Sequence, residues 1–245
     1  MQTSINRSLS AQIVVPCLNE ELSIPGFLNE LKAFRQTAQA AQLQFDFIFV
    51  DNGSTDHSFS MLTNHCQLNP SDQLFLCTEK GYGSALKFGF SRSTSELIGF
   101  LDLDCTYPLV SLIEMHNKIA LQSDLDIVIA NRMTKSSKMP FLRAVGNTFY
   151  VFIIAIVYRQ NLKDACSGMR LFRNIHLPSI LRLKNNGLGF SIELTCMTLI
   201  ENWTYRFVDI SYNERCGASK LNVITDGFSF LNQIFYSKRI QYDKS

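Results

Sequence analysis

Short apolar runs alternate with longer amphipathic stretches through the first half of the chain. The apolar runs predict β-strands at Ile13–Pro16, Phe45–Asp51, Leu74–Thr78, Leu97–Asp102 and Asp126–Ala130. Between them, apolar residues recur at helical spacing and predict helices over Glu20–Gln42, His57–Asn69, Gly83–Ser93 and Leu109–Ala120. Apolar strands that alternate with amphipathic helices are typical of a mostly parallel sheet covered on both faces. The pattern therefore predicts an α/β fold.

The pattern changes near Met139, where an unusually apolar stretch begins and runs to Tyr158. Beyond it the spacing predicts a strand at Ala165–Phe172, a helix at Gly189–Glu201, a strand at Tyr205–Tyr212 and an amphipathic helix at Ile224–Ile240. No linker rich in Pro, Gly or Ser and no internal repeat interrupts the chain. We therefore expect a single domain over residues 1–245 with a C-terminal extension.

Composition narrows the class of protein. Of the 245 residues, 46% are apolar and 18% are charged, which excludes intrinsic disorder and a coiled coil. A formal net charge of +2 argues against nucleic acid as the main partner, because proteins that follow phosphate backbones usually carry a clear basic excess. The seven cysteines form no C-x-x-C pair, so we expect reduced thiols rather than a disulfide framework or a zinc site.

The sequence offers little sign of a membrane-spanning segment. The N-terminal stretch Met1–Ala11 is polar and lacks the apolar core of a signal peptide. The longest apolar run, Phe149–Tyr158, is shorter than the roughly 20 residues that cross a bilayer. We expect that the protein does not cross a membrane by itself, while association with a membrane surface stays open.

Polar residues cluster directly after the predicted strands. They are Asn19, Glu20, Asp51, Asn52, Lys80, Asp102 and Asp104. In open α/β sheets, ligands bind beyond the carboxyl ends of the strands. The sequence therefore predicts a ligand site at this edge.

The segment Gly99–Pro108, GFLDLDCTYP, carries the most chemistry. Asp102 and Asp104 follow an apolar strand one residue apart, so their side chains point to the same side if the strand geometry persists. Such a pair holds a hard divalent cation when a diphosphate supplies further oxygen ligands. A solvated acidic turn would give the same letters.

Two further segments have both a structural and a functional interpretation. Val50–Asp56, VDNGSTD, places acid and amide groups at a strand end, and helix capping also explains it. Lys80–Gly89, KGYGSALKFG, has glycines at the start of a helix, where free N–H groups favour phosphate. It is neither a Walker A loop nor G-x-G-x-x-G, because Leu86 stands where the third glycine belongs.

Four segments in order, IVVPCLNEE, VDNGSTD, KGYGSALKFGF and GFLDLDCTYP, resemble the nucleotide-binding half of family 2 glycosyltransferases. The later segments ANR, RAVGN, DACSGMRLF and NERCGASKL resemble its polyprenyl-phosphate branch, which includes dolichol-phosphate mannose synthase and dolichyl-phosphate glucosyltransferase. The resemblance covers Ile13–Ile240. It implies a GT-A-like, Rossmann-type sheet, with a nucleotide-sugar-binding half at about 11–131 and an acceptor-binding, membrane-proximal half at about 132–245.

The resemblance also implies roles for individual residues. Positions assigned to the nucleotide-sugar donor are Pro16, Leu18, Glu20, Val50, Asn52, Lys80, Asp102, Leu103, Asp104, Arg132, Arg215 and Lys220. Metal ligands are Asp102, Asp104 and Thr106, and the catalytic residues are Asp104, Arg132 and Arg170. Arg143 is a further candidate for the acceptor phosphate. The chain departs from the family pattern at Leu18, Asn52 and Thr106, where tyrosine, aspartate and glutamine are usual. A solvated surface charge is the alternative for each basic residue.

The acceptor decides whether a catalytic base is needed. A phosphate monoester is largely dianionic at neutral pH, so it attacks the sugar without a general base. A hydroxyl acceptor would require a carboxylate or histidine base, for which Glu193 is the obvious candidate. The four histidines show no ligand or triad spacing and no G-x-S-x-G occurs, so metalloprotease and serine hydrolase functions have no support.

The predicted function is metal-dependent transfer, with inversion, of a sugar from a UDP- or GDP-sugar to polyprenyl or dolichyl phosphate. The cofactor is Mg²⁺ or Mn²⁺. The alternatives are transfer to a glycan or protein hydroxyl and a non-catalytic nucleotide-sugar-binding protein. Leu142–Tyr158 and Ile224–Ile240 have apolar faces flanked by Arg or Lys, as interfacial helices do, although core packing also explains them. We expect a peripheral protein on the cytoplasmic face of a membrane, with a homo-oligomer or a membrane-protein partner as further options.

Overall fold

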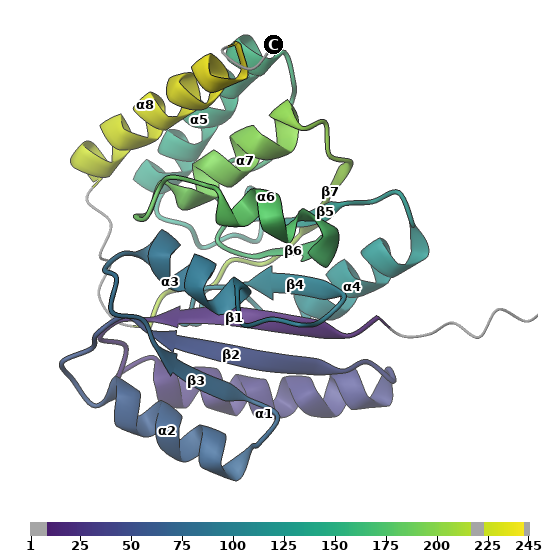
Figure 1. The fold of residues 1–245 in the computed structure, drawn as a ribbon, viewed down its shortest axis with the longest axis vertical. Helices are drawn as coiled ribbons and strands as arrows, with labels where there is room; N and C mark the ends of the chain where they lie inside the picture. Colours follow the sequence, from purple (N-terminus) through teal and green to yellow (C-terminus); the bar gives the residue numbers. More distant parts are fainter. Residues whose placement is uncertain (1–8, 217–222, 243–245) are drawn as a thin grey trace, which may run out of the picture.

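The computed structural model describes residues 9–216 and 223–242. The first half of the chain forms β1 (Ala11–Cys17), α1 (Ile24–Ala40), β2 (Phe45–Asp51), α2 (Ser58–Leu68), β3 (Gln73–Leu76), α3 (Tyr82–Phe90), β4 (Leu97–Phe100), α4 (Ser111–Leu121) and β5 (Ile127–Asn131). The second half forms α5 (Phe141–Tyr158), β6 (Arg170–Arg173), a 3₁₀ turn at Asn174–His176, α6 (Leu177–Leu181), α7 (Phe190–Ile200), β7 (Tyr205–Asp209) and α8 (Val223–Tyr242). Figure 1 shows these elements around one central sheet.

The sheet has seven strands in the order β3-β2-β1-β4-β6-β5-β7. All neighbouring pairs are parallel except those of β6, which runs antiparallel to both β4 and β5. The start of β6 therefore lies beside the end of β4, with Arg170 opposite Phe100. The predicted mostly parallel α/β fold is confirmed, and β6 is its exception.

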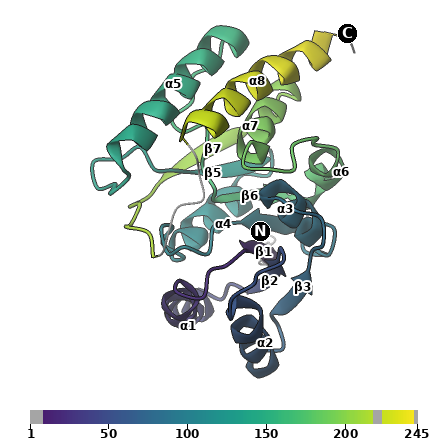
Figure 2. The same ribbon diagram turned by 90° about the vertical axis from the view of Figure 1, so that its left-hand side faces the viewer.

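Side chains alternate between the two faces of the sheet, so each strand contributes to two cores. On β1, Ile13 and Val15 pack with α1, α2 and α4, whereas Val14 packs with α3, α6 and α7. A third core joins α5 and α8 to the outer side of α7. Figure 2 shows the result, with α1, α2 and α4 on one face of the sheet, α3, α6 and α7 on the other, and α5 and α8 as an outermost layer.

Several predicted elements are longer than the observed ones. The predicted strand Leu97–Asp102 ends at Phe100, which leaves both acids in the following loop. The predicted strand Ala165–Phe172 begins only at Arg170, because the preceding residues form a loop held by polar side chains. The short helix α6 follows Asn174–His176 and was not predicted, because its five residues are too few to show a helical period.

The sequence analysis expected the apolar run at Phe149–Tyr158 to be too short to cross a bilayer, and the length of α5 corrects this expectation. The apolar run continues through Arg143 and Asn147 into one helix of 18 residues with a mean hydropathy of 1.7, of which 11% is buried. By length and composition this is the one helix in the described ranges that is both long and apolar enough to cross a membrane. The reduced state predicted for the cysteines agrees with seven free thiols.

The close contact of α3 with the sheet gives a test of the packing. A Cβ atom on Gly89 would lie 2.4 Å from Val14 Cγ1 and 2.9 Å from Val50 Cγ2. We expect Gly89→Ala to lower the free energy of unfolding by roughly 1–3 kcal/mol through overpacking. Urea denaturation measures the change.

Gly146 provides the matched control, since it also lies within a helix. A Cβ atom there meets nothing closer than Tyr150 Cε2 at 4.0 Å. Gly146→Ala should keep or raise stability by up to about 1 kcal/mol, because alanine is the better helix former. Equal losses in the two variants would contradict the packing described for α3.

Candidate active site

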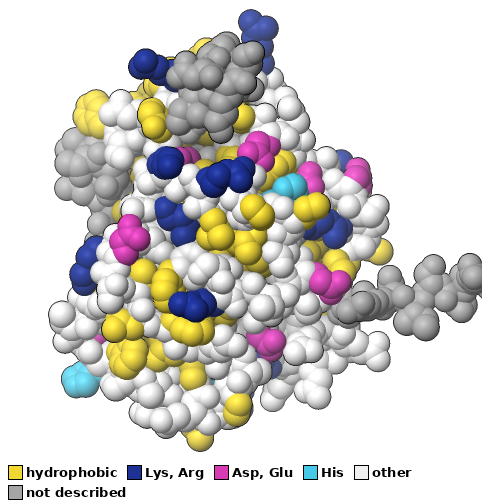
Figure 3. Space-filling view, viewed as in Figure 1, with side chains coloured by type: hydrophobic (Ala, Val, Ile, Leu, Met, Phe, Trp, Pro, Cys, Tyr) yellow, Lys and Arg dark blue, Asp and Glu magenta, His cyan; other side chains and the backbone are white. Residues whose placement is uncertain are grey.

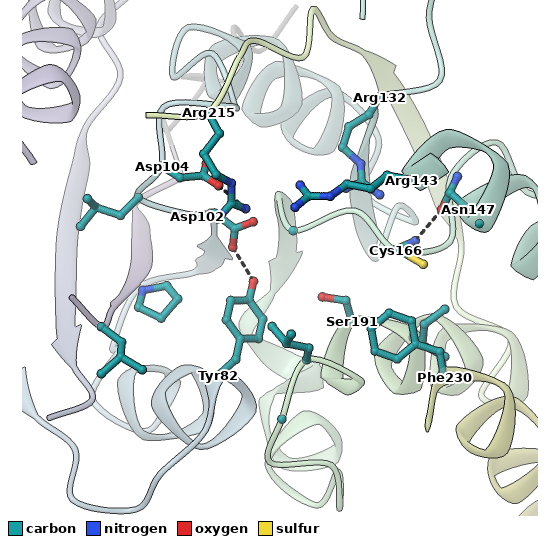
Figure 4. Close-up of a pocket in the computed structure, with 18 of the residues that line it drawn as sticks. Tyr82, Asp102, Asp104, Arg132, Arg143, Asn147, Cys166, Ser191, Arg215 and Phe230 are labelled. Atoms are coloured by element: carbon teal, nitrogen blue, oxygen red, sulfur yellow. Dashed lines mark hydrogen bonds and ion pairs between the residues drawn. The ribbon is translucent and has the colours of Figure 1, made fainter. Parts of the chain in front are cut away.

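A pocket of about 490 Å³ opens at the carboxyl ends of β1 and β4. Its walls come from the loops after these strands, from the start of α3 and from α5, α7 and α8. Residues from both halves of the chain therefore enclose one cavity. Figure 4 shows Asp102, Asp104 and Arg215 on one side of this pocket and Arg132 and Arg143 on the other.

The acidic side consists of Asp102 and Asp104 in the loop after β4. The hydroxyl of Tyr82, at the start of α3, donates a hydrogen bond of 2.8 Å to Asp102 Oδ1. Burial and the nearby Asp104 carboxylate raise the pKa of Asp102 to about 7. Thr106 donates to Asp104 Oδ1 twice, from its backbone N at 3.1 Å and from its hydroxyl at 2.5 Å. Two close carboxylates with fixed oxygens favour a cation between them.

Gly168 allows the loop before β6 to approach Asp102. A Cβ atom on this residue would lie 2.6 Å from Asp102 Oδ2. The backbone N of Gly168 donates to the hydroxyl of Tyr107 at 2.7 Å, which fixes the loop in this position. A side chain at position 168 would thus displace the first acid of the pair.

The basic side of the pocket is organised by an ion pair. Arg132 donates to Asp164 from Nε at 2.7 Å and from Nη2 at 2.8 Å, and the Asp164 side chain is fully buried. Burial, the largest single effect, lowers the pKa of Arg132, but Asp164, Tyr107 and Cys166 together raise it, so the pKa lies well above its ordinary value. Arg143 extends from α5 beside Arg132 (Figure 4). Two guanidinium groups side by side can bind an anion such as a carboxylate or a phosphate.

A third arginine lies on the acidic side. Arg215 Nη2 forms an ion pair of 2.6 Å with Asp104 Oδ2. Figure 4 shows its guanidinium next to both acids and apart from Arg132 and Arg143. The pocket therefore has two separate basic regions, one paired with the acids and one facing them.

The hydrogen bonds of Asn52 explain why asparagine stands where aspartate is usual in the family pattern. Its amide nitrogen donates to the carbonyl oxygens of Cys77 at 3.1 Å and Glu79 at 2.7 Å, and its Oδ1 accepts from the N of Gly81. A carboxylate could not donate these two hydrogen bonds. Asn52 thus fixes the loop that carries Tyr82 toward the pocket.

The groups available to a metal are limited. No group of three or more His, Cys, Asp or Glu residues arranged for a metal occurs in residues 9–216 and 223–242. Three carboxylates line the pocket, Glu20, Asp102 and Asp104, and only the last two share one loop, so a cation held by this pair needs further oxygens from a substrate. The hydroxyl of Thr106, predicted as a ligand, is fully buried and bound to Asp104. This geometry makes Thr106 a residue that orients Asp104.

Most of the predicted site residues lie together in the pocket. Those that line it are Pro16, Leu18, Glu20, Asn52, Asp102, Leu103, Asp104, Arg132, Arg143 and Arg215. Those absent from its lining are Val50, Lys80, Thr106 and Arg170. Lys220 lies outside the described residues. Lys80 instead binds the carbonyl oxygens of Asn52 and Gly53, at 3.3 and 3.5 Å.

Val50 and Arg170 require a physical explanation. Val50 is fully buried beneath α3, because its side chain points to the face of the sheet that α3 covers. Arg170 is fully buried as well, and burial lowers its pKa to about 10. Its guanidinium donates to Thr195 Oγ1 and to the carbonyl oxygens of Ser167, Ala165 and Ser191. The predicted phosphate contact of Arg170 is thus replaced by a role in holding the loop before β6.

Three residues of the site were missed from the sequence. Tyr82 binds Asp102, Asp164 binds Arg132, and Asn147 Oδ1 accepts from the backbone N of Ala165 at 3.2 Å and of Cys166 at 3.1 Å. All three stand inside segments that carried the resemblance, KGYGSALKFG, DACSGMRLF and RAVGN. Their roles depend on distant partners, so no local pattern identified them.

Glu193, the candidate base for a hydroxyl acceptor, does not line the pocket. It is buried, and its oxygens accept from the backbone N of Lys184 at 3.0 Å and of Asn185 at 2.7 Å. Both oxygens are therefore used in fixing the loop before α7.

Comparison with known sequences gives a matching family and several relatives. The sequence model of the family described as "Glycosyl transferase family 2" matches residues 12–180. A low-salt glycan biosynthesis hexosyltransferase of Haloferax volcanii is 25% identical over 222 residues, which are 88% of this chain and 51% of that one. A dolichyl-phosphate hexose transferase of the same organism is 29% identical over 149 residues, 60% of this chain and 64% of that one. The chain thus spans about half the length of the first relative.

Solved structures share the fold. Glucosyl-3-phosphoglycerate synthase from Mycobacterium tuberculosis, crystallised with Mn²⁺, UDP-glucose and phosphoglyceric acid, matches with a TM-score of 0.73. The match covers 94% of this chain and 80% of that one at 14% sequence identity. The seven-stranded, mostly parallel sheet therefore has the GT-A fold of these neighbours.

The ion pair between Arg132 and Asp164 gives a second test. Asp164→Asn removes the charge that compensates a nearly buried guanidinium, with 11% of the Arg132 side chain exposed. We expect a loss of roughly 3–5 kcal/mol in the free energy of unfolding, typical of a broken buried pair. Urea denaturation at neutral pH measures it.

Glu114→Gln serves as the control, because Glu114 pairs with Lys118 on the surface with 60% of its side chain exposed. Its loss should stay below about 1 kcal/mol. Similar losses in the two variants would show that the buried pair does not hold Arg132 as described.

Proposed function

Because the chain belongs to glycosyl transferase family 2, we propose that it transfers one sugar from a nucleotide diphosphate sugar to a polyprenyl phosphate, with inversion and with a divalent cation. The observation that carries the proposal is the pocket with two charged sides. Asp102 and Asp104 face Arg132 and Arg143 across it. A metal-bound diphosphate suits the first side and a second phosphate suits the other.

On the donor side, Asp102 and Asp104 would hold Mg²⁺ or Mn²⁺ together with the diphosphate. The bound cation supplies stabilisation of the negative charge that builds on the leaving diphosphate. The protein keeps the two carboxylates in place through Tyr82 and Thr106. The loop held by Asn52 borders the same pocket, and Pro16, Leu18 and Glu20 are also part of its lining.

On the acceptor side, Arg132 and Arg143 would bind the phosphate of the lipid. A dianionic phosphate oxygen is already a competent nucleophile, so the site needs no general base. The described residues fit this requirement, since the alternative base Glu193 is bound to backbone N–H groups away from the pocket. This geometry favours a phosphate acceptor over a glycan or protein hydroxyl.

The rest of the pocket supports an isoprenoid acceptor. Its lining also includes apolar and aromatic side chains from α5, α7 and α8, namely Leu142, Tyr150, Ile192 and Phe230. Apolar surface of this kind matches a hydrocarbon chain attached to the phosphate. The similarity to a dolichyl-phosphate hexose transferase supports the same acceptor class.

We propose further that α5 and α8 lie on the cytoplasmic face of a membrane. The outer side of α5 exposes large apolar side chains, among them Phe149, Phe152 and Ile156 at 47%, 60% and 60%. On α8, Phe228 and Phe235 are exposed in the same way. Figure 3 shows apolar and basic side chains close together at the upper end of the molecule, where these helices lie. Interfacial helices combine these two properties.

A helix in the plane of the membrane fits α5 better than a spanning one. Its inner side carries Arg143 and Asn147 into the pocket, and Asn147 is bound to the loop at residues 165–166. A spanning position would remove these groups from the pocket. An in-plane position keeps them there and places the apolar lining next to the lipid.

The reaction is tested by measuring transfer from UDP- and GDP-sugars, with Mg²⁺ or Mn²⁺, to a polyprenyl phosphate and to the matching polyprenol. We expect transfer to the phosphate alone, because the alcohol lacks the group that Arg132 and Arg143 bind. Asp104→Ala should reduce kcat at least 100-fold. Arg143→Ala should raise the acceptor KM roughly tenfold, the effect of losing one charge-assisted contact.

The variant Glu193→Gln distinguishes transfer to a phosphate from transfer to a glycan or protein hydroxyl. It should retain most activity, whereas a hydroxyl-transferring enzyme that uses Glu193 as its base would lose it. Transfer to the alcohol would overturn the acceptor assignment. Nucleotide-sugar binding without turnover under any of these conditions would identify a non-catalytic binding protein.

Membrane association is tested by sedimentation with vesicles that contain anionic lipid. We expect the wild-type chain to sediment and the double variant Phe152→Asp/Ile156→Asp to stay in the supernatant, because burying a charge in the acyl boundary is unfavourable. Leu121→Asp is the control, since Leu121 is 78% exposed at the end of α4. Equal sedimentation of all three proteins, or of none, would contradict the assigned surface.

A further inference from the structure

Every oxygen of the Asp104 carboxylate already has a partner within the protein. Oδ1 accepts two hydrogen bonds from Thr106. Oδ2 lies 2.6 Å from Arg215 Nη2 in an ion pair, and no hydrogen bond of good geometry reaches this oxygen. The 3% exposure of the Asp104 side chain leaves it little contact with water. Oδ2 is therefore the one oxygen of Asp104 that a cation could use, and Arg215 holds it.

The backbone around Arg215 is fixed to the loop that carries the acids. The N of Asn213 donates to the carbonyl oxygen of Thr106 at 2.9 Å, and the N of Cys216 donates to that of Asp104 at 3.1 Å. Ser23 Oγ donates to the carbonyl oxygen of Cys216 at 2.6 Å. The guanidinium can turn away from Asp104 by rotation of its side chain, while this backbone stays in place.

Arg215 and a divalent cation cannot share Asp104 Oδ2 at low free energy. A hard cation binds a carboxylate oxygen at about 2.1 Å, which would place it within about 4.7 Å of the guanidinium nitrogen. Only 24% of the Arg215 side chain and 3% of the Asp104 side chain are exposed, so solvent screens the repulsion between the two positive charges less than it would at the surface. The second acid offers no alternative position for the arginine, because a cation held by both carboxylates occupies the space between them.

We propose that Arg215 is an internal counter-ion of Asp104 that a divalent cation must displace, and that the donor diphosphate binds the displaced guanidinium. This inference rests on the proposed metal-dependent transfer. Its consequence is cooperative binding, because the nucleotide gives Arg215 a new partner at the moment when the metal takes its old one. Linkage makes the effect reciprocal, so metal and nucleotide each strengthen the binding of the other.

Neither of the other arginines in the described pocket lining serves this function. Arg132 is held by two hydrogen bonds to Asp164. Arg143 lies beside Arg132, across the pocket from the acids (Figure 4). Only Arg215 among these three is paired with a carboxylate that the metal would need.

The test measures Mn²⁺ binding directly, from the signal of free Mn²⁺ in electron paramagnetic resonance, with and without UDP or GDP. Wild type is compared with Arg215→Met and Arg215→Lys. Without nucleotide, Arg215→Met should bind Mn²⁺ roughly tenfold more tightly than wild type, because the competing charge is gone. The strengthening of Mn²⁺ binding by nucleotide should be several-fold smaller in this variant. Arg215→Lys keeps the charge and should resemble wild type.

Arg206→Met is the matched control, because Arg206 is exposed on β7 and its described hydrogen bond is to the carbonyl oxygen of Tyr205. It should leave Mn²⁺ affinity unchanged. Thermal unfolding adds a second measurement, since Mn²⁺ should raise the Tm of Arg215→Met more than that of wild type.

The outcomes separate this inference from the proposed function. Equal Mn²⁺ affinity of wild type and Arg215→Met, with equal strengthening by nucleotide, would overturn the role of Arg215 and leave metal-dependent transfer intact. Failure of all the proteins to bind Mn²⁺ even with UDP or GDP would overturn the metal-dependent function itself. Tighter binding in Arg206→Met as well would show a general charge effect and also refute the specific pairing.

Discussion

The antiparallel insertion of β6 between β4 and β5 determines how the two halves of the chain form one site. In a purely parallel sheet the loop before a strand lies at the edge opposite to the ligand site. Because β6 is reversed, its start lies beside the end of β4, where Asp102 and Asp104 follow. The loop at residues 164–169 reaches this edge, and the buried guanidinium of Arg170 holds it there through backbone carbonyl oxygens. Arg170 thus stabilises the loop that borders the acids, although Arg170 itself does not line the pocket.

Charge separation in the pocket follows from this arrangement. The loop before β6 contributes Asp164, which orients Arg132, and Gly168, whose missing side chain leaves space for Asp102. Three charged groups of the cavity are thereby held by neighbouring side chains: Asp102 by Tyr82, Asp104 by Thr106 and Arg132 by Asp164. Charges held in this way need little reorganisation when a substrate changes its charge distribution, which is the physical basis of electrostatic catalysis.

The sequence predicted those parts of the site that depend on local pattern. Asp102 and Asp104 were found because they follow an apolar strand, and parallel strands bring their carboxyl ends to one edge. Arg170 and Val50 were assigned by motif position, but burial depends on neighbours that no motif contains: β6 sits between two strands, and α3 covers Val50. The contacts of Tyr82 and Asp164 join residues 20 and 32 positions apart. Such contacts arise from tertiary packing, so the period of a single element does not reveal them.

The same long-range contacts connect the apolar outer layer to the charged pocket. Asn147 on α5 accepts hydrogen bonds from the backbone N of Ala165 and Cys166, next to Asp164. Asp164 in turn fixes Arg132, so α5 and the anion site are parts of one hydrogen-bonded unit. If α5 lies on the membrane as proposed, the depth at which it rests sets the height of Arg132 and Arg143 above the lipid. The acceptor phosphate is confined to the same level by its hydrocarbon chain. The geometry of one helix would therefore bring the anion site and its substrate to a common plane without any movement of the sheet.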